Sequence, residues 1–143
     1  MFNKKFYCIP TDDKEIIKIV GKFKNKLSSG HDEIPLKLLK FSIKSIVKPV
    51  VHIINSSLIT GIFPDELKIS KVVPVYKKGD KTDRSNYRPI SVLPALSKIY
   101  ERVMYNRIFK HLIDNNLFDN QQHGFRRGKS VVTAFWLNSM SRL

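Results

Sequence analysis

Basic side chains are the groups in this sequence with the clearest chemical potential, because they can bind phosphate. The chain carries 26 lysine and arginine residues against 12 aspartate and glutamate residues, a formal net charge of +14. All arginines lie in the second half, which contains two polar, basic stretches at 77–86 and 121–130. This balance favours a polyanionic partner, and nucleic acid is the commonest one. The alternative is that the charge only maintains solubility.

Metal and thiol chemistry find little support in the residue types. The single cysteine, Cys8, excludes an internal disulfide and a cysteine-based zinc site. The histidines lack metal-ligand spacing; they are His31, His52, His111 and His123. Asp12 and Asp13 form an adjacent acidic pair, but their place before an apolar periodic segment predicts a helix cap. No catalytic residue and no metal ligand is therefore predicted in this chain.

The apolar runs are far shorter than the roughly 20 residues that a membrane span needs. The first five residues include two lysines, but no apolar segment with a small-residue cleavage site follows them. We therefore expect an intracellular protein without a membrane partner. Nucleus and cytoplasm are not distinguished.

The first half of the chain has helical periodicity. Residues 13–27 carry apolar side chains at helical spacing and lysines on another face, which predicts an amphipathic helix with a solvated lysine row at Lys18, Lys22 and Lys26. Residues 28–35 have the composition of a loop. A second apolar stripe runs from residue 36 to Gly61, and Pro49 within it predicts either two helices or one kinked helix.

The second half begins with a strand pattern. Residues 72–76 and 87–93 are rich in β-branched and aromatic residues, and the polar stretch between them predicts a hairpin with a long charged tip. Pro74 and Pro89 place these strands at a sheet edge or beside a bulge. A helix is predicted over 95–115, then a basic glycine-containing loop and a further helix from about 131. The expected fold class is α+β, mainly helical with one β-hairpin.

Four stretches together resemble the reverse transcriptases of non-LTR (LINE-like) retrotransposons. They are 29–35 (SGHDEIP), 61–80 (GIFPDELK running into KVVPVYKKGD), 86–102 (NYRPISVL with SKIYER) and 122–130 (QHGFRRGKS). Their order and spacing also fit, and the likeness covers roughly residues 6–136. It implies that the chain, 1–143, is a partial reverse transcriptase domain: the fingers subdomain of a right-hand polymerase and the start of the palm.

The sequence departs from this family at four points. Leu67 stands where tryptophan is usual, His31 where proline is usual, and Val131 where threonine often follows the serine. The catalytic aspartates of the palm have no counterpart, so palm and thumb are expected to be missing. The family's chemistry uses two Mg²⁺ ions held by those carboxylates. Mg²⁺ is therefore expected for the full-length enzyme, no cofactor for this fragment, and no polymerase activity from this chain alone.

The resemblance also implies roles for individual residues. Lys77 and Arg88 match the positions that meet the phosphates of an incoming deoxynucleoside triphosphate, and Lys78 is expected to assist. Residues expected near the template are Gly30, Asp32, Gln122, Gly124, Phe125, Arg126 and Arg127. The expected partners in the full-length enzyme are an RNA template, a DNA primer, the nucleotide and the missing palm and thumb. Two placements stay open for the helix cations, beside the heteroduplex or on a solvated face, and the solvated face is the expected one; these cations are Lys98, Arg102, Arg107 and Lys110.

Two other interpretations stay open at this point. The chain is either a fingers fragment of a polymerase, a basic protein that binds nucleic acid without catalysis, or a relic without function. Because fingers normally pack against a palm sheet, an isolated fragment is expected to expose an apolar face and to be marginally stable.

Overall fold

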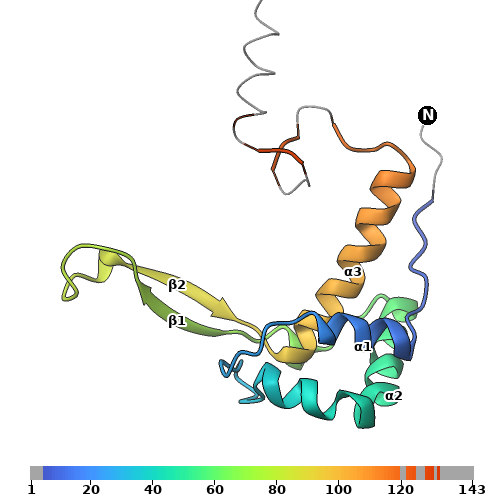
Figure 1. Cartoon of the computed structure of the whole chain (residues 1–143), viewed down its shortest axis with the longest axis horizontal. Helices are drawn as coiled ribbons and strands as arrows, with labels where there is room; N and C mark the ends of the chain where they lie inside the picture. Colours follow the sequence, from blue (N-terminus) through green and yellow to red (C-terminus); the bar gives the residue numbers. More distant parts are fainter. Residues whose placement is uncertain (1–4, 120–121, 125–127, 131, 133–143) are drawn as a thin grey trace, which may run out of the picture. The chain divides into compact units, whose positions relative to one another are not determined.

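The computed structural model describes residues 5–119, 122–124, 128–130 and 132. The chain divides into two compact units, one of residues 7–107 and one of residues 1–6 and 108–143. The described elements follow the order α1, α2, β1, β2 and α3, with short 3₁₀ turns before β1 and before β2 (Figure 1). The mixed architecture, mainly helical with one antiparallel hairpin, confirms the expected fold class.

Helix α1 (Asp13–Gly21) begins as predicted but ends earlier. The Asp12 carboxylate accepts a hydrogen bond from the Glu15 backbone amide (2.7 Å), which confirms the cap. The expected extension to residue 27 is wrong. The amides of Lys22 and Phe23 bond three residues back, which closes the helix, and the Phe23 carbonyl accepts from Lys40 Nζ (2.8 Å). Leu27, counted in the apolar stripe, is 75% exposed.

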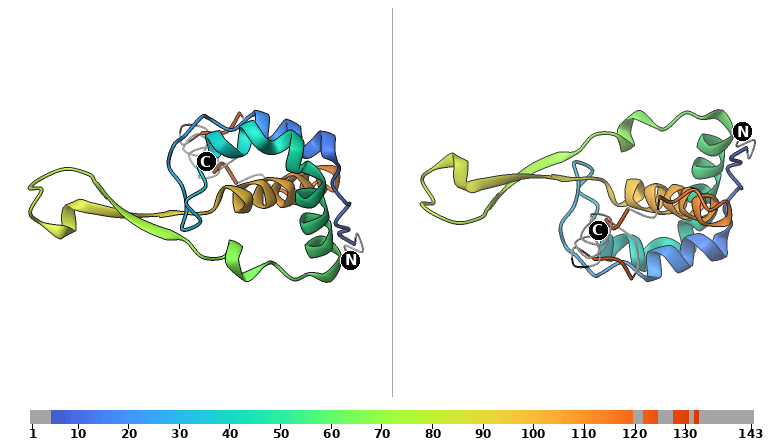
Figure 2. Two further views of the ribbon diagram at one scale, coloured as in Figure 1. Left: turned by 90° about the horizontal axis from the view of Figure 1, so that it is seen from below. Right: turned by 90° about the horizontal axis from the view of Figure 1, so that it is seen from above.

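Helix α2 (Leu36–Thr60) is one helix that contains Pro49, so the kinked alternative is the correct one. Its ribbon changes direction midway along its length (Figure 2). A proline inside a helix removes one backbone hydrogen bond and crowds the preceding turn, which accounts for the bend. The helix ends at Gly61, whose left-handed φ of 72° fits glycine and whose amide donates to the Ser57 carbonyl (2.9 Å).

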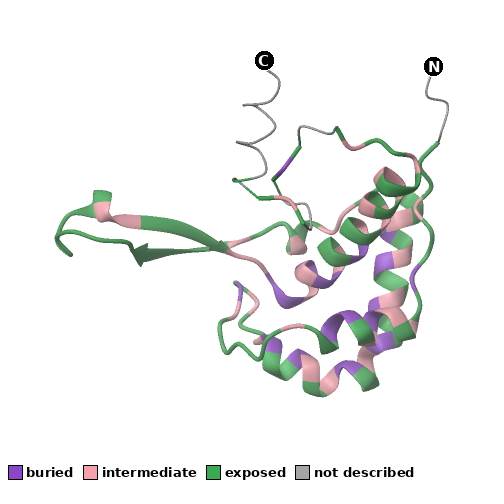
Figure 3. Cartoon of the chain, turned by 45° about the horizontal axis from the view of Figure 1, so that its top comes forward, coloured by how far each residue is buried: buried purple, intermediate pink, exposed green. Residues whose placement is uncertain are grey.

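The apolar core of the larger unit lies between the three helices (Figure 3). Ile16 on α1 and Ile99 and Val103 on α3 (Ala95–Asp114) are completely buried. Helix α2 adds a buried side chain at nearly every turn, which is why its stripe continues through the bend. The buried residues of α2 are Leu36, Leu39, Ile43, Val47, Val50, Ile54 and Ser57.

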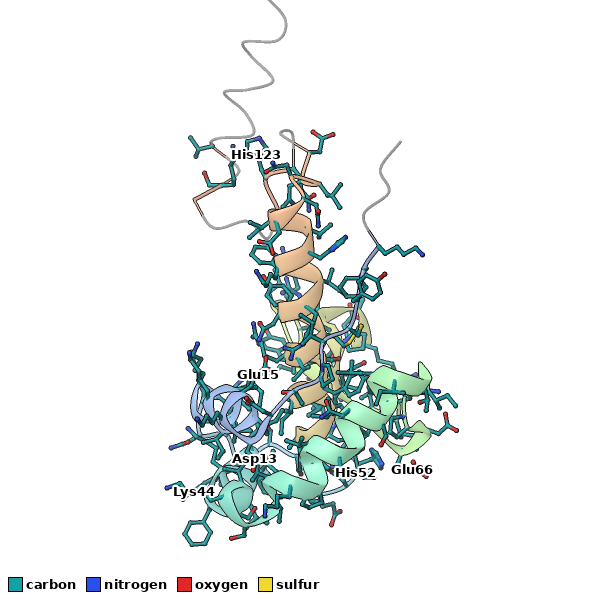
Figure 4. All side chains as sticks on the ribbon, turned by 90° about the vertical axis from the view of Figure 1, so that its right-hand side faces the viewer. Asp13, Glu15, Lys44, His52, Glu66 and His123 are labelled. Atoms are coloured by element: carbon teal, nitrogen blue, oxygen red, sulfur yellow. The ribbon has the colours of Figure 1, made fainter. Side chains whose placement is uncertain are left out.

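A polar network closes the end of this core. Arg107 on α3 binds both carboxylate oxygens of Glu15 on α1 and donates to the Ile9 carbonyl (3.0 Å); Glu15 is labelled in Figure 4. Thr11 donates its hydroxyl to Glu15 (2.7 Å) and exchanges two backbone hydrogen bonds with the Asn55 amide group (2.8 and 3.0 Å). The Arg107 side chain is only 12% exposed, so its expected position on a solvated face is wrong. It joins the N-terminal segment to α3.

The Glu15 carboxylate makes stability pH-dependent. Hydrogen bonding from Arg107 holds the pKa of Glu15 below its ordinary value of 4.5, although partial burial opposes this. The stabilisation is therefore complete above about pH 4.5 and is lost as pH falls through the lower folded-state pKa. We expect Glu15→Gln to destabilise the chain in urea melts at pH 6 and to destabilise it less at pH 3, where the unfolded-state carboxyl is protonated. An equal loss at both pH values would contradict the ion pair.

The hairpin pairs β1 (Lys71–Tyr76) with β2 (Tyr87–Val92), close to the predicted strands. The two prolines lie directly opposite each other, Pro74 against Pro89. The Lys77 amide donates to the Asn86 carbonyl (2.8 Å), and hydrogen-bonded pairs alternate along an antiparallel ladder. Counting from that pair, the prolines occupy a non-hydrogen-bonded pair, where a backbone N–H would point away from the partner strand. The ladder therefore loses no hydrogen bond to either proline.

The loop of residues 28–35 packs against the base of the hairpin. Gly30 is buried, and a Cβ added to it would lie 2.7 Å from the Pro94 nitrogen and 2.9 Å from the Leu93 carbonyl carbon. His31 Nδ1 lies 3.1 Å from the Ile69 carbonyl oxygen. The buried Ser97 hydroxyl donates to the Leu67 carbonyl (2.7 Å). These contacts position the hairpin relative to α2 and α3 within the larger unit.

Helix α3 ends where the sequence predicted. The amides of Asn116 and Leu117 donate to the carbonyls of Ile113 (3.0 Å) and Leu112 (2.9 Å), and Asn116 adopts a left-handed φ of 52°. This is a Schellman end with asparagine in place of the usual glycine. Across the described ranges, no helix has both the length and the hydropathy to cross a membrane.

Candidate functional site

The hairpin brings Lys77 and Arg88 to the same face. Side chains alternate between the two faces of a strand, and Arg88 is paired with Val75, two residues before Lys77. Lys77 continues the ladder through its bond to Asn86. Lys77 and Arg88 are thus diagonal cross-strand neighbours, with Cβ atoms about 7 Å apart. Two long cationic side chains at this spacing can approach one polyphosphate group together.

The tip of the hairpin uses its own carboxylates to order its backbone. Asp80 accepts from the Thr82 amide and hydroxyl (both 2.8 Å), and Asp83 accepts from the Ser85 amide (2.9 Å) and hydroxyl (2.8 Å). These hydrogen bonds hold the pKa of both carboxyl groups below the usual range. The tip is therefore a defined turn although its side chains are largely exposed.

The lysines and arginines of the hairpin form no ion pairs with the tip carboxylates, because Asp80 and Asp83 accept hydrogen bonds from their own turn. Within the described part of the chain, the ion pairs are Lys68–Asp65, Arg107–Glu15 and Lys110–Asp114, and none involves the hairpin. Lys78 lies just beyond β1 and is exposed. Exposed, unpaired cations of one sign attract anions through their summed field. The basic residues of the hairpin and its tip are Lys71, Lys77, Lys78, Lys81, Arg84 and Arg88.

The opposite face of the hairpin carries an aromatic pair near the tip. The rings of Tyr76 and Tyr87 meet edge to face with centroids 5.7 Å apart, and Lys81 Nζ lies 5.7 Å from the Tyr76 ring centroid. The Tyr87 hydroxyl donates to the Lys81 carbonyl (2.8 Å), and Gly79, with φ of 91°, packs against the Asn86 side chain. This pair therefore supports the tip on the face away from Lys77 and Arg88.

The face that holds Lys77 and Arg88 is also apolar closer to the core. Val73, Val75 and Ile90 project from it and are 36–46% exposed. Large apolar side chains are exposed elsewhere too, notably Phe41 at 89%. The apolar face expected to pack against a palm stays a prediction.

The residues expected near the template fall into separate places. Asp32 is half-buried, and its carboxylate accepts a hydrogen bond from the Ile34 amide (3.3 Å). Asp32 and Gly30 therefore shape the loop of residues 28–35. Gln122 and Gly124 are exposed and belong to the other unit. Three further residues of this prediction lie outside the described residues: Phe125, Arg126 and Arg127. The structure therefore leaves the template prediction open.

The helix cations differ in their surroundings. Arg107 is internal, Lys110 pairs with Asp114 on the surface (2.7 Å), and Arg102 is exposed with its guanidinium carbon 5.4 Å from the Tyr105 ring centroid.

No group of three or more histidine, cysteine, aspartate or glutamate side chains in the described ranges is arranged to hold a metal ion.

Comparison with known proteins identifies relatives of this chain. It is 30% identical over 124 residues to the probable RNA-directed DNA polymerase from transposon BS of Drosophila melanogaster, covering 86% of this chain and 14% of the relative. It is 30% identical over 118 residues to the RNA-directed DNA polymerase from mobile element jockey of Drosophila funebris (82% and 13%). A putative 115 kDa protein of the element R1DM is 31% identical over 123 residues (85% and 12%). No protein-family model matches the chain.

These matches establish the class: the chain is homologous to a segment of RNA-directed DNA polymerases. Within that class, its relatives come from non-LTR retrotransposons, which confirms the family that the sequence motifs indicated. The chain spans only about one seventh of the length of the relatives that it matches. The mixed fold, with its basic hairpin, is consistent with a partial fingers domain.

Proposed function

We propose that this segment is the fingers part of a retrotransposon RNA-directed DNA polymerase and that its hairpin binds the triphosphate of the incoming deoxynucleotide. Lys77 and Arg88 make the main phosphate contacts, and Lys78 adds charge at the end of β1. A guanidinium group can bind two phosphate oxygens at once, whereas an ammonium group acts as a compact charge. The proposed template contacts involve the two loops around Gly30 and Gln122.

The observation that carries this proposal is the shared face of Lys77 and Arg88. These two residues are 11 positions apart in sequence, yet the strand register and the hydrogen bond of Lys77 to Asn86 place both on one face of the hairpin. The tip carboxylates bond to their own turn instead of neutralising these cations. The names of the relatives supply the class of reaction for which such a site is suited.

We expect deoxythymidine triphosphate to perturb the hairpin in a ¹⁵N NMR titration of the chain. The largest amide shift changes should fall between residues 75 and 90, because a highly charged ligand changes the field at the nearest amides. The double variant Lys77→Gln/Arg88→Gln should weaken binding by on the order of tenfold or more, since each charged hydrogen bond contributes about 1.5–3 kcal/mol.

The matched control for this titration is Lys44→Gln/Lys48→Gln, which removes the same charge from the exposed surface of α2. It should bind the nucleotide like the parent chain. Equal weakening by the two double variants would show that net charge, and not the hairpin geometry, attracts the nucleotide. Shifts confined to residues outside the hairpin would also reject the proposal.

We further propose that polymerisation requires carboxylates outside this segment, which would bind Mg²⁺ in the complete enzyme. A two-metal displacement needs acidic ligands that hold both ions against the primer hydroxyl and the phosphates. We expect the 143-residue chain to show no primer extension on an RNA template with Mg²⁺ and all four nucleotides. Template-dependent extension by the purified chain would overturn this.

One observation supports the alternative function, a basic protein that binds nucleic acid without catalysis. The cations of the hairpin are unpaired within the described residues, so the segment can bind polyanions without a palm. Under either role we place the protein inside the cell.

A further inference from the structure

A second basic surface lies on the helical part of the larger unit, away from the hairpin strands. A cavity of about 610 Å³ opens between α1 and α3, and we call it the α1–α3 groove. Its lining includes two lysines of α1, the lysine that directly follows α1 and one arginine of α3; these are Lys14, Lys18, Lys22 and Arg102. The volume falls in the range of ligand-binding clefts in proteins. The groove therefore differs from an ordinary solvated helix face.

The cations of the groove are regularly spaced. Lys14, Lys18 and Lys22 are four residues apart, and Lys22, directly after α1, keeps a right-handed helical backbone (φ −78°, ψ −14°). The three therefore lie in a row with about 6 Å between successive positions along the helix axis. That spacing is comparable to the distance between neighbouring phosphates of one extended nucleic-acid strand. Arg102 faces the row from α3, which extends the positive surface to the other wall.

The one acidic residue that lines the groove does not cancel these charges. Both oxygens of the Glu15 carboxylate bind Arg107, which is not among the residues that line the groove. In the described part of the chain, the ion pairs leave out all four groove cations, and these four side chains are exposed. Arg102 lies near the Tyr105 ring, but an aromatic ring does not neutralise its charge. The groove is therefore strongly positive.

The remaining lining favours contacts that do not depend on base sequence. Ile19 and Phe23 form the apolar part of the groove, and Asn106 adds one amide. Phosphate contacts by lysine and arginine fix the position of a strand without reading its bases. Like charges held in one concave surface also repel one another, and a polyanion relieves that repulsion.

We propose that the α1–α3 groove binds the phosphate backbone of a single nucleic-acid strand as a second site, distinct from the nucleotide-binding hairpin. The proposal does not rest on the role of Lys77 and Arg88. The strand chemistry that it requires, a row of phosphodiesters, is shared by RNA and DNA.

The test measures binding of fluorescein-labelled 20-nucleotide oligouridylate and oligothymidylate to the full chain by anisotropy at several salt concentrations. The groove variant is Lys14→Gln/Lys18→Gln/Lys22→Gln, in which glutamine keeps a similar helix propensity. Loss of three phosphate contacts should flatten the slope of log K against log salt by about 2 and weaken binding at 0.1 M salt by on the order of 100-fold.

A charge-matched control separates the groove from net charge. The variant Lys37→Gln/Lys44→Gln/Lys48→Gln removes three exposed lysines from α2 (Lys44 is labelled in Figure 4). It should change the slope and the affinity much less than the groove variant. Equal effects of the two triple variants would overturn the proposal, because they would show diffuse attraction to a basic chain.

Lysine footprinting of the unaltered chain makes the test independent of how the variants fold. Amine acetylation read by mass spectrometry should show Lys14, Lys18 and Lys22 protected by either oligonucleotide, with Lys37, Lys44 and Lys48 still reactive. Inorganic tripolyphosphate should protect the row far less at equal phosphate concentration. Equal protection by tripolyphosphate, or no protection by either strand, would reject a strand-binding groove. Loss of Lys77 and Arg88 should leave the protection unchanged.

Discussion

Replacing Arg107 with alanine is expected to destabilise the larger unit by about 3 kcal/mol, because it leaves a partly buried carboxylate without its counter-charge. The Arg107 side chain is 12% exposed and the Glu15 side chain 26%. The guanidinium also bonds to the carbonyls of Ile9 and Pro10, so the N-terminal segment loses its connection to α3. In thermal melts followed by circular dichroism, the midpoint should fall by on the order of 10 °C.

A double-mutant cycle with Glu15→Gln tests the origin of that loss. The double variant should lose much less unfolding free energy than the sum of the two single variants, because each substitution removes the same interaction. Lys110→Ala is the surface control: it removes a pair whose partners are more than half exposed and should cost about 0.5 kcal/mol or less. A loss for Arg107→Ala as small as that of Lys110→Ala would show that the network contributes little.

Gly30→Ala is expected to have a comparable effect through packing alone. The added Cβ would meet backbone atoms of Leu93 and Pro94 at 2.7–2.9 Å, where no flexible side chain can move aside. The loop or the start of α3 must then shift, at a cost of about 2–3 kcal/mol. Urea unfolding should show a lower midpoint with an unchanged slope.

Gly21→Ala is the matched control for this substitution. Gly21 lies at the end of α1, and a Cβ there meets no atom within 4 Å. The change should be neutral or slightly stabilising, because alanine favours helix over glycine. If Gly30→Ala were equally harmless, the close approach of the loop to the hairpin base would not be a stability determinant. A local change in hairpin amide signals would separate a shifted hairpin from global unfolding.

Elements that depend on local pattern were predictable from the sequence. The hairpin strands followed from β-branched residues around a polar turn, and the stop of α3 followed from an asparagine pair that accepts left-handed φ. The cap at Asp12 was visible for the same reason: a short polar side chain precedes an amphipathic run. In each case the interactions lie within a few residues.

The errors arose where distant residues decide the outcome. Helix α1 was extended to residue 27 because the apolar spacing continues, but Lys40, 17 residues after Phe23, takes up a carbonyl beyond the true end. Arg107 resembled a surface cation, and only the contact with Glu15, 92 residues away, makes it internal. Periodicity contains no information about such partners.

In the candidate site, too, the sequence indicated local features but not the partners that come from distant parts of the chain. Lys77 and Arg88 were selected from motif positions, and strand register then brought them to one face. The lysine row of α1 was visible in the sequence, but as Lys18, Lys22 and Lys26 on a solvated face. The structure replaces Lys26 with Lys14 and adds Arg102 from another helix. An amphipathic pattern marks the polar side of a helix without showing what lies opposite.

The facing prolines of the hairpin bear on aggregation. An exposed valine-rich strand with a free edge is a template on which another chain can add a strand. Pro74 and Pro89 remove the outward-facing donor at the same level of both edges, so neither edge offers an uninterrupted row of hydrogen-bond donors. A newly synthesised chain can thus expose Val73, Val75 and Ile90 with less risk of growing into an intermolecular sheet. Partners are thereby directed to the faces of the hairpin, where its lysine and arginine lie.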